Sequence, residues 1–339
     1  YKKFTYVRQE SYKLNYIAKV ELGESKLDNP YDTFKEFYTN DYQKFVEYNI
    51  QDVELVDRLE DKMGLIDLCL TMAYDFKVNY TDVYSQVRCW DTLIYNHLHK
   101  KKIAIPPRED HDKATQFEGA YVKDPQLGLH KWIVSFDLNS LYPHLIMQYN
   151  NSPETYVGVE PKNIGVENYL NQKFNLKWLK EKNLTIAPNG ALFRRDIQGF
   201  LPELMKKNYD ARVVFKKKMI KAKQEYEKTK DPIYKKEISR CHNIQMAKKI
   251  SLNSAYGAIG NQYFRYFEKN QAEAITMGGQ LTIRWVEKDI NKFMNKVLGT
   301  DNKNYPLGLQ LIGRPLDEQK LLNIAFAAEK KINFKQNLQ

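Results

Sequence analysis

One long run without helix-breaking residues constrains the fold of this chain more than any other feature. Residues 203–229 contain no glycine or proline, and Pro202 stands where a helix can begin. Asp231-Pro232 then breaks the pattern, and a second helical run extends to about Asn253. Because two helices joined by so short a break fold back on one another, the sequence predicts an antiparallel helical hairpin.

The hairpin segment carries most of the positive charge of the protein. Residues 199–259 contain fifteen Lys and Arg against six Asp and Glu, an excess of nine positive charges in a chain of net charge +11. A basic block of this kind binds polyanions by neutralising phosphates and releasing counterions. A well-solvated helical surface has the same composition, so charge alone leaves both interpretations open.

Polar residues recur along both predicted helices at helical spacing. Arg212 and Lys216 are four residues apart on the first helix. On the second, Lys249, Asn253 and Tyr256 stand at i, i+4 and i+7, so they share one face. Three cations facing one cavity would bind the tail of a triphosphate, with arginine gripping two oxygens and lysine acting as a compact charge. We therefore expect a nucleotide as the ligand of this hairpin.

A single carboxylate is predicted at the end of a buried strand. The apolar run 132–136 is typical of such a strand, and Asp137 follows it, ahead of a turn whose backbone N–H groups can bind phosphate. Asp137 is expected to hold Mg²⁺ beside the triphosphate. Tyr142, fixed by Pro143, would place a flat ring under the sugar and clash with a 2′-hydroxyl. Taken alone, Asp137 has the alternative role of a cap and Tyr142 that of a core lid.

Other segments predict regular structure on both sides of these motifs. The expected elements are a helix over 40–76 with Asn40 as its N-cap, a helix over 90–98, a strand over 119–122, irregular structure over 150–200, and a helix over 271–297. Tyr48 and Asp52 are expected on one face of the helix over 40–76.

Cysteine content and hydropathy indicate the environment in which the protein works. Cys69, Cys89 and Cys241 are few, odd in number and far apart, which suggests neither a disulfide framework nor a zinc site and fits a reducing compartment. No apolar run approaches the ~20 residues needed to cross a bilayer. The sequence therefore predicts a soluble multidomain protein without a membrane partner.

Two motifs resemble those of family B DNA polymerases of the T-even-phage type. Asp137 to Pro143 is similar to that family's first palm motif, D-x-x-S-L-Y-P, and Lys249 to Gly257 is similar to its fingers motif, K-x-x-x-N-S-x-Y-G. Residues 198–202 resemble the entry to the fingers, and residues 117–122 resemble the linker between exonuclease and palm. The resemblance covers roughly residues 1–304.

This resemblance implies a role in DNA synthesis for each residue of the two motifs. Asp137 would bind both Mg²⁺ ions of a two-metal nucleotidyltransferase. Tyr256 and Gly257 would lie against the nascent base pair. The dNTP would be held by the turn after Asp137 and by polar residues of the fingers, with Tyr142 as the sugar gate. The turn residues are Leu138, Asn139, Ser140, Leu141 and Tyr142, and the fingers residues are Arg212, Lys216, Lys249 and Asn253.

A third motif resembles part of a proofreading 3′–5′ exonuclease. Tyr48 to Asp52 is similar to the Y-x-x-x-D motif of that domain. The resemblance makes Asp52 a metal ligand and Tyr48 an orienter of the attacking water. For a pattern this short, two ordinary helix residues are the alternative.

The same resemblance implies an α/β multidomain fold, a partial right-hand polymerase with a palm sheet and an α-helical fingers hairpin, preceded by the end of an RNase H-like exonuclease domain. The expected segments are the end of the exonuclease domain (1–64), an N-terminal-domain or linker segment (65–115), the first part of the palm (116–198), the fingers (199–259), the second part of the palm (260–304) and an unrelated tail (305–339). Residues 306–339 instead resemble the C-terminal end of amidase-signature enzymes, without their catalytic Ser or Lys.

The sequence departs from the family pattern at the second palm carboxylate. No Y-x-D-T-D hairpin is found, and neither the first two exonuclease motifs nor the thumb is recognised. We expect a parent enzyme that is a replicative, proofreading phage-type polymerase, and an isolated chain that is weakly active or inactive. A non-catalytic nucleic-acid-binding fragment is the main alternative, ahead of an RNA polymerase or an amidase.

The expected partners follow from this assignment. They are primer–template DNA, dNTP and, for the parent enzyme, a sliding clamp. The expected location is the cytoplasm, which is that of the host cell if a phage encodes the chain.

Overall fold

The chain forms two compact units, each built from two separate segments. The first unit contains residues 1–103 and 209–251, and the second contains residues 104–208 and 252–339. The computed structural model describes residues 1–5, 8–109, 118–124, 127–128, 134–135, 137–160, 164–171, 177–298 and 309–310.

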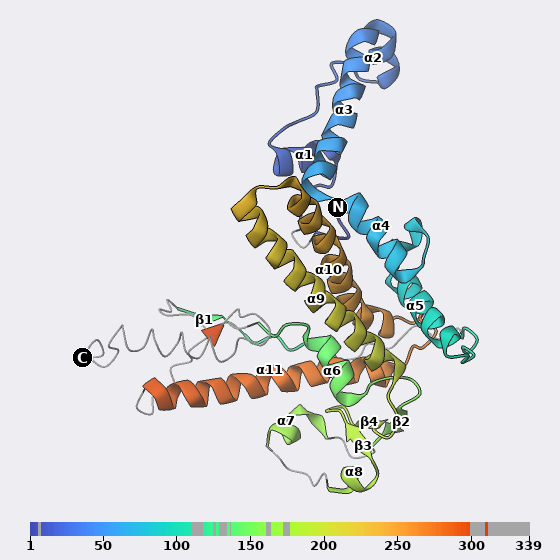
Figure 1. The fold of residues 1–339 in the computed structure, drawn as a ribbon, viewed down its shortest axis with the longest axis vertical. Helices are drawn as coiled ribbons and strands as arrows, with labels where there is room; N and C mark the ends of the chain where they lie inside the picture. The colour runs from blue at the N-terminus through green and yellow to red at the C-terminus, as the bar shows by residue number, and fades with distance from the viewer. Residues whose placement is uncertain are drawn as a thin grey trace. The chain divides into compact units, whose positions relative to one another are not determined.

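Helices make up the regular structure described in the first unit (Figure 1). Before the hairpin these helices are α1 (Leu14–Leu22), α2 (Phe34–Asn40), α3 (Tyr42–Met63), α4 (Leu65–Phe76), the 3₁₀ helix η1 (Tyr80–Tyr84) and α5 (Gln86–Lys100). The helix predicted over 90–98 is confirmed by α5.

The helix predicted over 40–76 is wrong at its start and in its middle. Asn40 is the last residue of α2, and Asp41 is the N-cap of α3, where its side chain accepts the N–H of Lys44 at 3.4 Å. Gly64 then ends α3 with a φ of 59°. Glycine adopts this left-handed conformation without steric cost, so it separates two helices that share one continuous apolar periodicity.

The core of the first unit joins α4 to α10. Leu68, Met72 and Phe76 of α4 pack in one cluster with Val83 of η1 and Ala247 of α10. Each of these side chains is at most 6% exposed, so the cluster excludes water and holds α10 against the N-terminal helices.

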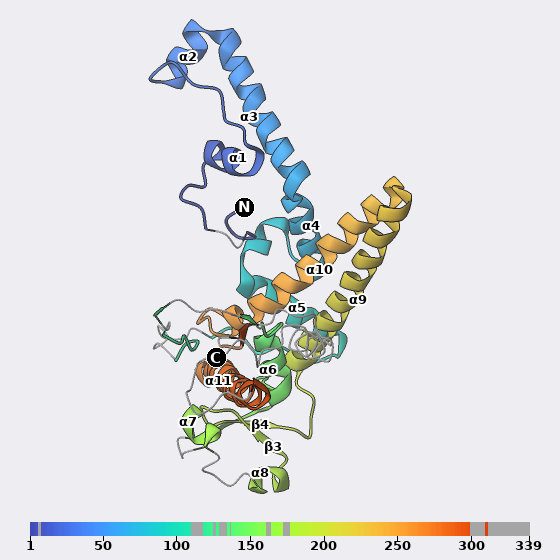
Figure 2. The same ribbon diagram turned by 90° about the vertical axis from the view of Figure 1, so that its left-hand side faces the viewer.

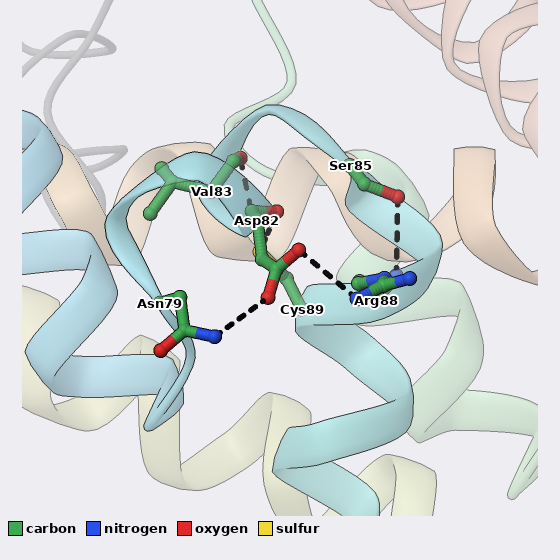
Figure 3. A network of polar contacts seen from close by, with 6 residues as sticks. All are labelled: Asn79, Asp82, Val83, Ser85, Arg88 and Cys89. Atoms are coloured by element: carbon green, nitrogen blue, oxygen red, sulfur yellow. Dashed lines mark hydrogen bonds and ion pairs between the residues drawn. The ribbon is translucent and has the colours of Figure 1, made fainter.

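A polar network fixes η1 at the start of α5 (Figure 3). The Arg88 guanidinium donates to Asp82 Oδ1 at 3.1 Å, and Asn79 Nδ2 donates to Asp82 Oδ2 at 3.5 Å. Ser85 caps α5 by accepting the N–H of Arg88 at 3.4 Å. Asp82 therefore links the residues before η1 to the first turn of α5.

The predicted hairpin is present as α9 (Phe200–Thr229) and α10 (Pro232–Ile259), which lie side by side in both views (Figure 1, Figure 2). Asp231 in the connection accepts the N–H of Ile233 at 2.9 Å. The pKa of Glu237 on α10 falls to about 2, chiefly because Arg240 hydrogen-bonds its carboxylate, and Lys218 of α9 contributes to this lowering. Lys218 of α9 and Glu237 of α10 thus attract one another electrostatically.

The second helix of the hairpin is longer than predicted. It continues past Asn253 to Ile259, through Gly257. Leu252, Ala255 and Ala258 are at most 1% exposed and carry its apolar face forward. Burial therefore outweighs the low helix propensity of the glycine.

The described residues of the second unit form two small sheets and four further helices. Strand β1 (Val134–Ser135) pairs in parallel with β5 (Leu309–Gln310), and an antiparallel sheet has the order β2-β4-β3. Its strands are β2 (Tyr156–Val159), β3 (Leu184–Ile186) and β4 (Ala191–Arg194), and the helices are α6 (Leu141–Tyr149), α7 (Gly165–Leu170), α8 (Lys177–Glu181) and α11 (Lys269–Leu298). β1 lies within the strand predicted over 132–136, of which residues 132, 133 and 136 lie outside the described residues.

The prediction of irregular structure over 150–200 is wrong. β3 and β4 form a hairpin whose connection contains Asn189-Gly190, with Gly190 at a φ of 89°. This dipeptide is a turn signal that the sequence does contain. The flanking strands have only three and four residues, which is too short for alternation of apolar residues to show.

The strand predicted over 119–122 is also wrong, because side chains of α11 satisfy this backbone. Thr276 Oγ1 donates to the carbonyl of Glu118 at 2.7 Å, and Gln280 Nε2 donates to the carbonyl of Gly119 at 2.8 Å. α11 itself confirms the helix predicted over 271–297. No helix among the described residues is long and apolar enough to span a membrane.

Candidate functional site

Asp137 follows β1 at the start of a turn, as predicted. Its side chain and that of Leu138 are exposed, whereas Asn139 and Ser140 are half-buried. Ser140 adopts a left-handed conformation with a φ of 54°, and its side chain does not cap α6. The first N–H groups of a helix without a side-chain cap can bind an anion.

The structure brings the two motifs together through their tyrosines. The ring of Tyr142, in the first turn of α6, lies with its centroid 4.9 Å from that of Tyr256 on α10, at an interplanar angle of 60°. Burial raises the pKa of Tyr142, and burial together with Tyr142 raises that of Tyr256. Both phenols are therefore neutral near pH 7 and offer flat apolar faces with a polar tip.

The remaining fingers residues of the second unit stand on the same helix as Tyr256. Asn253 and Gly257 are exposed, one turn before Tyr256 and directly after it. This stretch of α10 therefore presents an amide, an aromatic ring and a bare backbone segment in succession.

The predicted cations lie on the hairpin in the first unit. Arg212 and Lys216 are half-buried on α9, and Lys249 is half-buried on α10. Asp137 belongs to the second unit, so its convergence with these three side chains stays a prediction.

A salt bridge beside Lys249 holds α10 in place within the first unit. Lys248 Nζ lies 2.5 Å from Asp75 Oδ1, and the two side chains are 15% and 26% exposed. Asp75 stands near the end of α4, next to the apolar cluster.

The start of α9 is fixed by residues that sequence patterns missed. Asn150 Nδ2 donates to the carbonyls of Arg194 and Ile197 at 2.7 and 2.8 Å, and its Oδ1 accepts the N–H of Gly199 at 3.0 Å. Its φ of 58° is a conformation that asparagine tolerates better than most residues.

Ser152 and Glu154 complete the N-terminus of α9. Glu154 Oε1 accepts the N–H of Phe200 at 2.6 Å, and Ser152 Oγ accepts that of Leu201 at 3.3 Å. A Cβ on Gly199 would stand 2.6 Å from the Cβ of Ser152, so only glycine fits there. The sequence signal for this arrangement is the polar run 150–154 directly after α6, paired with a glycine at the start of the long helix.

Tyr48 and Asp52 share one face of α3, as predicted, with Lys26 between them. Lys26 Nζ lies 2.6 Å from Asp52 Oδ2 and 4.7 Å from the centroid of the Tyr48 ring. Burial lowers the pKa of Lys26, but its hydrogen bonds to Asp52 and Tyr48 outweigh that effect and raise it. Asp52 Oδ1 is buried and has no hydrogen-bond partner within the described part of the chain.

Within the described residues, no group of three His, Cys, Asp or Glu could hold a metal ion. The chemistry of Asp137 and Asp52 fits Mg²⁺, which prefers carboxylate oxygens and keeps several waters. The orphaned Asp52 Oδ1 has the same preference for a cation.

Comparison with known families decides the assignment. The model of the family described as DNA polymerase family B matches residues 78–324. The chain belongs to DNA polymerase family B. The prediction of a family B polymerase of the T-even-phage type is therefore confirmed, and the matched stretch includes part of the segment that resembles amidases.

Family B relatives from two phages match almost all of the chain. It is 31% identical over 350 residues to the DNA-directed DNA polymerase of Escherichia phage RB69, covering 91% of this chain and 38% of that protein. It is 32% identical over 351 residues to that of Enterobacteria phage T4, covering 90% of this chain and 38% of that protein. The chain therefore spans well under half the length of these relatives.

A solved family B polymerase has a similar fold. The structure from the hyperthermophilic archaeon Pyrobaculum calidifontis matches with a TM-score of 0.57 and 20% sequence identity, over 84% of this chain and 34% of that one. At this identity the likeness concerns the fold alone. It supports the prediction of a partial polymerase fold, while the exonuclease and palm boundaries stay predictions.

Proposed function

We propose that this chain contributes the first palm carboxylate and the fingers to the site of a replicative, phage-type DNA polymerase that extends a primer with dNTPs. The observation that carries the proposal is the contact between Tyr142 and Tyr256, because it joins the palm motif to the fingers motif within one unit. A polymerase site requires these two motifs to meet, whereas the folding of an unrelated helical protein does not.

In this proposal the chain's own residues bind and orient the nucleotide. The turn from Leu138 to Leu141 offers backbone N–H groups to the phosphates, and Arg212, Lys216, Lys249 and Asn253 hold the triphosphate tail from the hairpin. Asp137 would hold Mg²⁺, which would supply positive charge against the negative charge that develops on the phosphates.

The reaction is an in-line displacement. The oxygen of the primer 3′-hydroxyl forms a bond to the α-phosphorus of the dNTP, the bond to the bridging oxygen breaks, and pyrophosphate leaves while the hydroxyl proton passes to water. Tyr142 acts as the sugar gate, since its ring would clash with a 2′-hydroxyl. Tyr256 and Gly257 lie against the nascent base pair.

Nucleotide binding by the full chain tests the proposal directly. With a dideoxy-terminated primer–template and Mg²⁺, calorimetric titration of dATP should show binding by the parent protein and at least roughly tenfold weaker binding by Asp137→Asn, since metal and phosphate contacts are lost together. Asp124→Asn, at an exposed acid of the same unit, is the matched control and should bind as the parent does. Equal affinity in all three proteins would refute the assignment of Asp137.

Catalysis by the chain alone is a separate question. The sequence offers one palm carboxylate, and loss of one ligand of a two-metal site costs several orders of magnitude in rate. We propose that the chain extends primers weakly or not at all, as a DNA-binding part of a larger enzyme. Robust extension of a labelled primer with Mg²⁺ and dNTPs would contradict this.

The second proposed site is the metal site of a proofreading exonuclease. The observation that favours it is the buried, unpartnered Asp52 Oδ1 beside Tyr48. Electron paramagnetic resonance of bound Mn²⁺ should show a site in the parent that Asp52→Asn abolishes, whereas Asp57→Asn, at an exposed acid of the same helix, leaves it intact. Loss of Mn²⁺ in both variants, or in neither, would refute the role of Asp52.

Partners and location follow from the same proposal. Primer–template DNA should bind with an affinity that falls steeply with salt, because the basic hairpin neutralises phosphates. A sliding clamp is proposed as a partner of the parent enzyme, and the host cytoplasm as its location.

A further inference from the structure

Two consecutive glycines in the middle of α11 are unexpected in so long a helix. Gly278 and Gly279 lie inside α11, where glycine is a much poorer helix former than alanine. Both face tyrosines of α6, and α6 and α11 pack against one another. The glycines therefore allow close approach rather than a special backbone conformation.

Each glycine contacts its own tyrosine. A Cβ on Gly279 would stand 3.0 Å from Cε1 of Tyr142, and a Cβ on Gly278 would stand 2.9 Å from Cε2 of Tyr149. Aliphatic and aromatic carbons normally approach to about 3.5–4.0 Å. An added methyl group at either position therefore requires the neighbouring ring to move by several tenths of an ångström.

The two rings differ in their relation to the site. Tyr142 is half-buried, contacts Tyr256 of the fingers motif and is the proposed sugar gate. Tyr149, seven residues later, is the last residue of α6. It packs with Ala191 and Phe193 of β4 and with Ala187 in the connection between β3 and β4. Of the two glycines, only Gly279 thus contacts a tyrosine of the proposed nucleotide site.

We propose that Gly279 is a positioning residue for sugar selection: by lacking a side chain it lets the Tyr142 ring sit against α11, and so sets the space left for the sugar of the incoming nucleotide. The proposal rests on the proposed role of Tyr142 and adds a determinant that lies outside both motifs. A methyl group at residue 279 would displace the ring away from α11. In this proposal the displaced ring takes up space that the sugar would otherwise occupy.

Gly279→Ala is therefore expected to narrow the sugar site. Because a misplacement of about 1 Å can change rates or binding by roughly 100-fold, several tenths of an ångström should weaken dATP binding by roughly threefold to tenfold. ATP binding should weaken more, so the ratio of ATP to dATP dissociation constants rises. Gly278→Ala is a matched control, with the same gain in helix propensity and an equally close contact, but to Tyr149.

Thermal melts test the contact independently of nucleotides. Gly279→Ala should lower the melting temperature more in the parent than in a Tyr142→Ala background, where the ring that the new methyl group would meet is absent. Gly278→Ala should show no such dependence on Tyr142, but should depend on Tyr149→Ala in the same way. Equal effects of Gly279→Ala in the parent and Tyr142→Ala backgrounds would overturn the proposed contact.

Calorimetric titrations of dATP and ATP onto the protein with dideoxy-terminated primer–template and Mg²⁺ then test its consequence. The proposal requires the ATP to dATP ratio to rise in Gly279→Ala and to stay at the parental value in Gly278→Ala. If the melts show that the effect of Gly279→Ala depends on Tyr142, but the ratio of ATP to dATP dissociation constants is unchanged, Gly279 has no positioning role and Tyr142 remains the gate. If Tyr142→Ala leaves the parental ratio unchanged, or the parent binds neither nucleotide, the proposed function fails and the role of Gly279 fails with it.

Discussion

Removing the Asn150 side chain should loosen the start of α9 by an amount that follows from its contacts. The side chain makes three hydrogen bonds of 3.0 Å or less, two to carbonyls and one to the N–H of Gly199. Each contributes about 1 kcal/mol net, and the left-handed backbone costs alanine a further 1 kcal/mol or so. Water can replace part of these bonds because the site is only half-buried. Asn150→Ala should therefore destabilise this region by about 2–4 kcal/mol.

Asn183 offers a matched control for the backbone contribution. It also has a left-handed conformation, with a φ of 52°, but no side-chain hydrogen bond of it is found among the described residues. Asn183→Ala should therefore cost only about 1 kcal/mol. The difference between the two variants isolates the three hydrogen bonds of Asn150.

Amide hydrogen exchange measures the effect where it arises. Because about 1.4 kcal/mol corresponds to a factor of ten, the N–H groups of Gly199, Phe200 and Leu201 should exchange at least roughly 30-fold faster in Asn150→Ala than in the parent. Asn183→Ala should leave these three amides unchanged. If Asn150→Ala exchanges them as slowly as Asn183→Ala does, the side chain does not hold the start of α9 and the reasoning is refuted.

Three further outcomes follow from other contacts. Asp75→Asn removes the charge that Lys248 contacts and should lower the free energy of unfolding of the first unit by about 1–2 kcal/mol. Urea denaturation measures this loss, and an unchanged midpoint would show that the salt bridge contributes nothing. Burial raises the pKa of Cys89 to about 12, so its native thiol should react with a disulfide reagent at about pH 8 at least roughly 100-fold more slowly than in urea. Lys26→Ala leaves Asp52 without its cation and should lower the melting temperature near pH 7. Because the Lys26 pKa is raised, its stabilisation is present at neutral pH, and the melting difference should shrink as the pH rises past that pKa.

Long-range periodicity and breakers predicted the helices that matter most. The Gly- and Pro-free run ending at Thr229 and the break at Asp231-Pro232 are reproduced in α9 and α10, and the helix over 271–297 in α11. Long amphipathic helices repeat one signal many times, so a single residue changes little. The helix over 40–76 failed for the opposite reason, since one residue, Gly64, decides where α3 ends.

Short strands defeated the same reasoning. β3 and β4 are defined by the turn at Asn189-Gly190 and by their pairing, neither of which periodicity measures. At residues 119–122 the apolar pattern suggested a strand, but side chains of α11 bind the backbone where that strand would begin, at the carbonyls of Glu118 and Gly119. Contacts between segments far apart in the sequence therefore override a local preference.

The proposed site shows a similar division, between residues whose chemistry is recognisable from sequence and residues whose role depends on a partner elsewhere in the chain. The motifs identified Asp137, Tyr142 and Tyr256, because a charged or aromatic side chain at a fixed spacing has a chemical meaning of its own. The sequence gives no such meaning to Gly279 or Asn150 until their partners are known. Gly279 matters because it has no Cβ to meet a neighbouring ring, and Asn150 because it binds carbonyls more than forty residues away. Substitutions at such positions should change the geometry of the site while leaving both motifs intact. A search confined to the motifs would then find no cause for the altered selectivity or stability.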